Sequence, residues 1–138
     1  MPDLETIRQG VKTVLEDAIS GLTVYAMGET VHGLPAGVLI PSNADFTVTM
    51  GRGTDTWTFD LVVMVATGEL AHPQLDELVA GSGPRSIRQA IFKARKLGLS
   101  DLDAHVSELT SYNVALSSVE VDHVAATLRL IVHTKGLE

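Results

Sequence analysis

The stretch from Thr56 to Thr67 constrains the fold most, because its hydrophobic pattern changes halfway along. It opens with strict alternation, in which Trp57 and Phe59 face one side and Asp60 faces the other. From Val62 onward both faces are apolar. Alternation predicts a half-buried strand, and apolar residues on both faces predict a strand in the centre of a sheet. The chain is therefore expected to fold around one central β-strand.

Other segments carry patterns that place helices and further strands around this one. Apolar residues at three- and four-residue spacing predict a helix over residues 3–19, which Ser20 and Gly21 would end. Proline and glycine signals predict a helix pair, first from His72 to the Gly81–Gly83 break, then from Pro84 to about Leu97. Strands are expected at 23–26, 37–40, 46–50, 105–113 and 119–134, with turns at 41–43 and 51–55 and a turn or bulge near 122–123. This order predicts an α+β fold, with an N-terminal helix and a central helix pair packed on a mostly antiparallel sheet.

Length and composition favour one domain over residues 1–138 and exclude several classes of protein. The chain has 138 residues, a formal charge of −7 and 45% hydrophobic residues, which is typical of a globular domain. It has no cysteine, so disulfides and thiolate metal sites are excluded. The longest apolar run, Leu61 to Ala66, is too short for a membrane helix, and we expect no signal peptide. Gly10 interrupts the first helix, either for close packing or simply as a tolerated residue.

Motifs that carry catalytic or cofactor chemistry are missing from the sequence. The Gly-x-Gly pairs at Gly51 and Gly81 lack the further glycine and the lysine of a phosphate-binding loop. The five histidines are scattered, without the spacing of a metal-ligand set. No serine stands in a Gly-x-Ser-x-Gly elbow. We therefore expect no catalytic, cofactor-binding or metal-binding residues.

The second predicted helix of the pair is the most distinctive surface. Five of the ten basic residues lie between Arg85 and Lys96, on the arc opposite the apolar residues, and Phe92 lies among them. An aromatic residue surrounded by cations is typical of protein interfaces, although a solvated basic face explains the charges equally well. The candidate interface residues are Arg85, Arg88, Phe92, Lys93, Arg95 and Lys96, together with Arg52 and Asp55 at the predicted hairpin tip. Candidate acidic counterparts are Asp76, Glu77, Asp101 and Asp103.

Nearly the whole chain resembles the tail terminator proteins of bacteriophages with long non-contractile tails, especially those that infect actinobacteria. The resemblance lies in the order and spacing of four segments: LETIRQGVKTVLEDAISGLTVYA, LPAGVLIPSNADFTVTMGRGTDTWTFDLVVMVA, LDELVAGSGPRSIRQAI and VDHVAATLRLIVHT. The Ala-Gly-Ser-Gly break before a Ser-Ile helix is its most specific feature. The segment KARKLGLSDLDAH departs from the family pattern, because it carries more basic residues.

The resemblance implies an α+β subunit that assembles with itself into a homohexameric ring at the neck of the virion tail. Such a ring, assembled in the host cytoplasm, caps the tail tube protein, ends its polymerisation and offers a surface to the head–tail connector or stopper protein. DNA passes through its lumen without specific binding. An acidic subunit suits that passage, because like charge discourages DNA from adhering. The implied role involves no membrane, no cofactor and no catalysis.

Three alternatives stay open on the sequence. The first is another phage neck protein, such as a connector, stopper or tail completion factor. The second is a small oligomeric α+β enzyme of the thioesterase type, for which Asp60 is the carboxylate of most interest, although its alternation predicts exposure. The third is a nucleic-acid binder that uses the basic helix face, which an acidic chain with one basic element makes the weakest.

Overall fold

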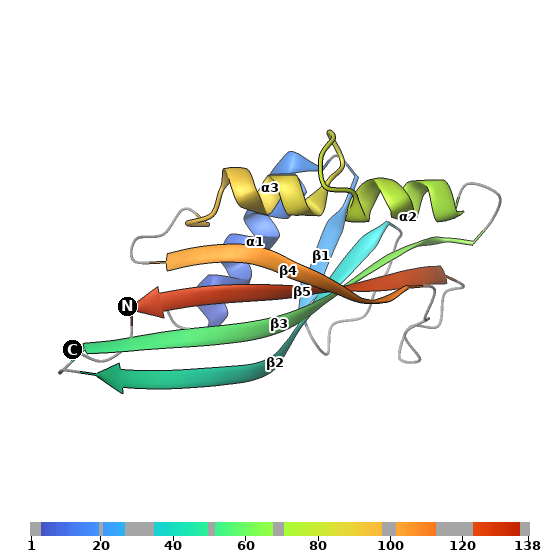
Figure 1. The fold of residues 1–138 in the computed structure, drawn as a ribbon. Coiled ribbons are helices and arrows are strands. Elements are labelled where there is room, and N and C mark those ends of the chain that lie inside the picture. Colours follow the sequence, from blue (N-terminus) through green and yellow to red (C-terminus); the bar gives the residue numbers. More distant parts are fainter. Residues whose placement is uncertain are drawn as a thin grey trace.

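The computed structural model describes residues 4–19, 21–26, 35–49, 52–67, 71–97, 102–112 and 123–135. It confirms the α+β class: three helices lie on one face of a five-stranded sheet (Figure 1). The helices are α1 (Leu4–Ala18), α2 (Ala71–Val79) and α3 (Ile87–Lys93), and the strands are β1 (Thr23–Ala26), β2 (Ala36–Thr49), β3 (Arg52–Ala66), β4 (Leu102–Tyr112) and β5 (His123–Lys135).

The sheet has the strand order β1-β2-β3-β5-β4, and β1 alone runs parallel to its neighbour. The central position of β3 confirms the prediction from its two-sided apolar pattern. Its odd-numbered residues, such as Phe59 and Leu61, point into the main core under the helices. Its even-numbered residues Val62 and Met64 pack on the opposite face in a smaller apolar cluster. The sheet thus has a helix face and an outer face.

The core on the helix face follows from the periodicity of each element. Helix α1 contributes Ile7, Val11 and Leu15, all fully buried. The last strand contributes the even-numbered residues that alternation predicts for one face: Val124, Ala126, Leu128, Leu130 and Val132. The end of α1 also matches its prediction, since Gly21 adopts a left-handed φ of 85° that favours glycine. Among the described residues, no helix is long and apolar enough to cross a membrane.

The predicted turn at Pro41-Ser42-Asn43 is wrong, because β2 runs straight through these residues. The register between β2 and β3 shifts there, which leaves Ser42 as the extra residue of a β-bulge. Strand β1 pairs only with Ala36–Leu39, so β2 is an edge strand from about Pro41 onward. Proline is tolerated at such an edge, since its missing N–H removes no ladder hydrogen bond on the free side.

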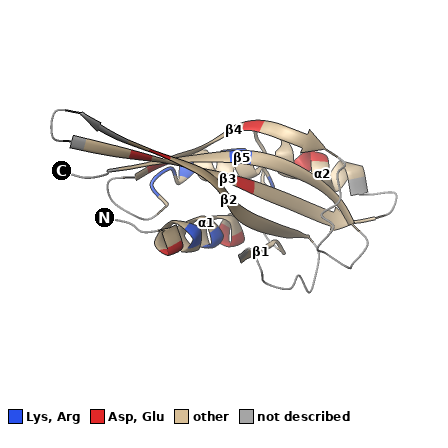
Figure 2. Ribbon diagram, turned by 90° about the horizontal axis from the view of Figure 1, so that it is seen from below, with Lys and Arg blue, Asp and Glu red and all other residues tan. Residues whose placement is uncertain are grey.

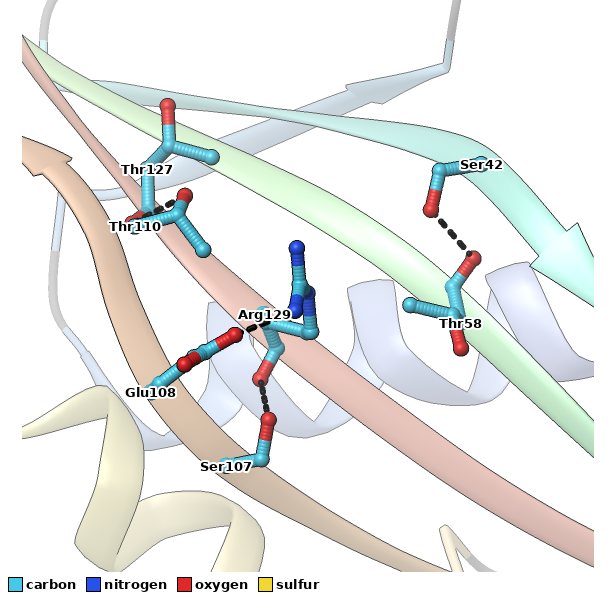
Figure 3. Close-up of polar contacts among 7 residues, drawn as sticks. All are labelled: Ser42, Thr58, Ser107, Glu108, Thr110, Thr127 and Arg129. Carbon is cyan, nitrogen blue, oxygen red and sulfur yellow. Dashed lines mark hydrogen bonds and ion pairs between the residues drawn. The ribbon is translucent and has the colours of Figure 1, made fainter.

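At three bulges, a side-chain hydroxyl bonds to a backbone carbonyl of the neighbouring strand (Figure 3). Ser42 donates its hydroxyl to the carbonyl of Thr58, Ser107 donates to that of Arg129, and Thr110 donates to that of Thr127. Each lies where the register of its strand pair shifts. A bulge interrupts the backbone ladder, so a hydroxyl that bonds to the neighbouring strand replaces part of the lost pairing.

The bounds of the β2–β3 hairpin and of strand β4 also differ from the predictions. Thr49 pairs with Arg52, so β3 begins there and Asp55 lies inside the strand rather than at a loop tip. Strand β4 begins at Leu102 rather than at His105, because Leu102 and Ala104 are buried against α3 and the main core. The predicted turn or bulge near residues 122–123 and the strand residues before it lie outside the described residues, except that β5 begins at His123.

Candidate functional site

The basic surface predicted on the second helix of the pair is centred on α3, but the helix is shorter than expected. It spans Ile87–Lys93 instead of residues 84–97. Ser86 starts it as the N-cap, because its Oγ accepts a hydrogen bond from the amide N of Gln89 at 3.1 Å. Its end is marked by Ala94, whose φ of −124° departs from helical geometry. Arg85 therefore precedes the helix, and Arg95 and Lys96 follow it in a turn.

Phe92 lies at the centre of this surface and is 65% exposed. The buried side of α3 carries Ile87 and Ile91, as the predicted arc requires. The guanidinium carbon of Arg95 lies 5.6 Å from the centroid of the Phe92 ring, within the range of a cation–π contact. This contact places the Arg95 guanidinium against the exposed ring. We call Arg88, Phe92, Lys93, Arg95 and Lys96 the basic surface.

Two of the predicted basic residues are already paired inside the subunit. Arg95 forms a bidentate ion pair with Asp103 of β4, with both N–O distances at 2.8 Å. Arg85 lies 3.7 Å from Glu77 of α2. The predicted acidic counterparts Asp103 and Glu77 thus pair within their own chain, and Asp76 accepts a hydrogen bond from Tyr112 at 2.7 Å. Asp101 lies outside the described residues.

The Arg95–Asp103 pair changes the titration of both groups. Hydrogen bonds from the Arg95 guanidinium lower the pKa of the Asp103 carboxyl, and the charges of Arg95, His105 and Lys96 act in the same direction. The same hydrogen bonds raise the pKa of Arg95. The amide N of Ala104 also donates to the carbonyl of Arg95 at 2.8 Å. Side chain and backbone together therefore tie the turn after α3 to the edge of β4.

Arg88 and Lys93 form no ion pair with the described residues, so they remain as cations beside Phe92. The Arg88 side chain passes over Gly81, where an added Cβ would lie 3.4 Å from its guanidinium. Next to it is a shallow hollow of about 260 Å³ between α3 and β4. Gly81, Arg88, Gln89, Phe92, His105 and Val106 line this hollow. An aromatic wall beside a guanidinium that has no ion-pair partner among the described residues suits an acidic or aromatic group from another molecule.

The hairpin candidates lie at the other edge of the sheet. The side chain of Arg52 lies outside the described residues. Asp55 is half-buried in β3, directly opposite Phe46 of β2. Phe46 is 65% exposed and meets the ring of Trp57 edge to face, with 5.5 Å between centroids. Sequence reasoning missed Phe46 as a surface residue, although its place in the alternating strand beside Asp45 was a usable signal.

The histidines are scattered in the sequence, but two pairs of rings meet in the fold. His105 and His133 stack on the outer face with 5.8 Å between centroids, and His133 Nδ1 lies 3.1 Å from the Thr56 hydroxyl. His72 stacks on Tyr112, whose pKa is raised chiefly by its hydrogen bond to Asp76. Within the part of the chain that the structure describes, no three His, Asp or Glu residues form a group that could hold a metal ion.

Asp60, the carboxylate of the enzyme alternative, is half-buried rather than exposed. It lies on the outer face, as its alternation predicts, where its register partners are Ile40 and Arg129. Arg129 itself pairs with Glu108 of β4. The described helices pack on the other face of the sheet (Figure 2), so Asp60 faces away from them.

Comparison of the chain with protein-family models and with curated protein sequences finds no match to either.

Proposed function

We propose that this chain is a structural subunit of a bacteriophage tail, which assembles into a homohexameric ring at the neck. The ring caps the tail tube, ends polymerisation of the tube protein and offers its other face to the connector or stopper protein. DNA passes through the lumen of the ring. The proposal rests on the resemblance in sequence to tail terminators and on an α+β subunit that carries exposed aromatic anchors.

The observation that carries the proposal is the basic surface around Phe92. Phe92 is 65% exposed, contacts the Arg95 guanidinium and lies next to Arg88 and Lys93, which form no ion pair with the described residues; this is the composition of an interface centre. The chain as a whole has a charge of −7, so a second copy offers many carboxylates to such a surface. Self-association is therefore the function that this geometry supports best.

The mass and shape of the protein in solution test the proposal. Light scattering is expected to give the mass of six subunits, and negative-stain images are expected to show a ring with a central hole. If the protein is a monomer alone, purified tail tubes are added and their ends are imaged. Tubes that stay uncapped would refute the proposal, and a compact dimer or tetramer would favour the enzyme alternative.

A further inference from the structure

Among the described residues, the two most exposed large hydrophobic side chains are Phe46 and Phe92, and their electrostatic surroundings differ. Each is 65% exposed, and each is held by a neighbour: Phe46 by Trp57 and Phe92 by Arg95. Exposed aromatic residues that are already ordered lose little side-chain entropy on binding, which makes them good anchors.

One carboxylate lies beside Phe46 on each face of this sheet edge. Asp55 is half-buried directly opposite Phe46 on β3 and shares its face, whereas Asp45 is exposed on the other face, because neighbouring residues of a strand alternate between faces. Arg52 is the one cation in sequence between these two aspartates, and its side chain lies outside the described residues. Across the molecule, Phe92 lies among Arg88, Lys93, Arg95 and Lys96, next to the hollow between α3 and β4. We call Asp45, Phe46, Asp55 and Trp57 the acidic hairpin surface. It is complementary in charge to the basic surface.

The two surfaces lie at opposite edges of the sheet. Phe46 pairs with Asp55, Asp55 with Thr134, and Thr134 with Leu102, so this row crosses all four strands from β2 to β4. Three strand spacings separate the edges by about 14 Å. Helix α3 packs on β4, at one edge. Phe46 lies at the other edge, in the part of β2 that does not pair with β1. One subunit therefore cannot join its own two surfaces, and each is free to meet the other surface of a second copy (Figure 1).

We propose that the acidic hairpin surface of one copy docks on the basic surface of the next, with Phe46 against the hollow beside Phe92. The contact is heterologous, since two unlike surfaces of the same chain meet, and such contacts form rings when the rotation closes. This inference rests on the proposed function and names the surfaces that would join the ring.

Reciprocal charge reversal tests the pairing. The hairpin variant carries Asp45→Lys and Asp55→Lys, and the helix variant carries Arg88→Glu and Lys93→Glu. Each alone places like charges at every contact, so association is expected to weaken about tenfold or more. In an equimolar mixture, each reversed surface meets a complementary one on the other variant. The mixture is therefore expected to restore the wild-type mass, as alternating subunits in a ring with an even number of copies.

A matched control and a neutral variant accompany this test. Arg8→Glu with Lys12→Glu on α1 changes the charge by the same amount as the helix variant, and it is expected to leave the assembly intact. Phe46→Ala is expected to weaken association, whereas Leu109→Ala removes a 46% exposed side chain from β4 without effect. Circular dichroism and thermal melting of each variant show that the subunit stays folded.

The outcomes separate this pairing from the proposed ring. If the wild type forms a six-subunit ring and the single variants form it equally well, or the mixture fails to restore it, the pairing is overturned and the ring stands. If the wild type is a twofold dimer that the variants break and the mixture restores, the pairing stands and the ring is overturned. A wild type that stays monomeric even on tail tubes would overturn both.

Discussion

At the scale of single residues, a close contact joins Gly10 of α1 to Leu97. A Cβ built on Gly10 would lie 3.0 Å from the Cβ of Leu97 and 3.1 Å from its carbonyl oxygen. Leu97 is itself buried, with a left-handed φ of 51° that is uncommon for a residue with a side chain. These distances support close packing at Gly10, the first of the two explanations that the sequence allows.

Replacement of Gly10 tests this packing. In an exposed helix, Gly10→Ala would stabilise by about 1 kcal/mol. Here the methyl group must displace the Leu97 backbone, and overpacking costs about 1–3 kcal/mol. We expect a net decrease of about 1 kcal/mol in the free energy of unfolding, measured by urea denaturation. Gln9→Ala, at an exposed position of the same helix, is the control and is expected to change stability little. A more stable Gly10→Ala protein would contradict the contact.

The Arg95–Asp103 pair predicts a pH dependence. Because Arg95 lowers the pKa of the Asp103 carboxyl, the pair stabilises the fold above the ordinary carboxyl pKa of about 3.9, and this stabilisation is lost as pH falls through the lowered value. Asp103→Asn is therefore expected to melt at a slightly lower temperature than the wild type at pH 7. The difference should shrink below about pH 4 and vanish at lower pH.

Melting curves of both proteins between pH 7 and pH 2 measure this difference. Asp17→Asn, at an exposed position of α1, is the control and is expected to show no such convergence. A gap between wild type and Asp103→Asn that stays constant with pH would show that the ion pair is not its cause.

At the scale of elements, the break between α2 and α3 depends on Ser86. Its side chain accepts a hydrogen bond from the amide N of Gln89 and donates one to the carbonyl of Ala80, and it is almost fully buried. Gln89 returns a bond by accepting from the amide N of Gly83 at 2.8 Å. Gly83 has a φ of 120°, which favours glycine. This network sets where α3 begins and therefore where Phe92 points.

Loss of the Ser86 hydroxyl is expected to destabilise this corner. Ser86→Ala removes a helix cap, which costs about 1–2 kcal/mol, and leaves the part-buried carbonyl of Ala80 and amide of Gln89 without this partner. We expect that decrease in chemical denaturation. Ser82→Ala, at an exposed position of the same break, is the matched control. Equal stability of the two variants would contradict the role assigned to Ser86.

The elements that could be predicted from the sequence are those with long, regular periodicity. Helix α1, the central place of β3 and the buried face of β5 all follow from their patterns. The errors concern boundaries, where a tertiary contact outweighs a local signal. Pro41 looks like a turn residue, but it lies at the point where β2 becomes an edge strand. Leu102 and Ala104 belong to β4 because α3 covers them, which no local pattern shows.

The candidate site could be predicted only in part, for the same reason. The exposure of Phe92 follows from the helical arc. The intramolecular partners of Arg85 and Arg95 do not follow, because Glu77 and Asp103 come close only through the packing of α2 and β4. The pairing of His105 with His133 likewise depends on strand register.

At the scale of the whole molecule, replacement of Phe92 is expected to affect self-association but not folding. Because the side chain is mostly exposed, Phe92→Ala is expected to keep the free energy of unfolding within about 0.5 kcal/mol of the wild-type value, with little change in melting temperature. Loss of a central aromatic anchor is expected to weaken self-association by about 2 kcal/mol or more. Light scattering over a dilution series measures the second effect. Unchanged association together with an unchanged melting temperature would remove α3 from the interface.

The position of β5 between β3 and β4 also determines when the sheet can be completed during synthesis. Strands β3 and β4 share β5 as their common neighbour, yet β5 is the last of the described elements to leave the ribosome. Thr54 of β3 pairs with Lys135 of β5, and such pairing between distant parts of a chain forms slowly. Until β5 is made, the edges of β3 and β4 that pair with it have no partner strand. A chain cut before His123 would leave β4 unconnected to the rest of the sheet. A copy made only as far as His123 therefore lacks the strand that joins β3 to β4.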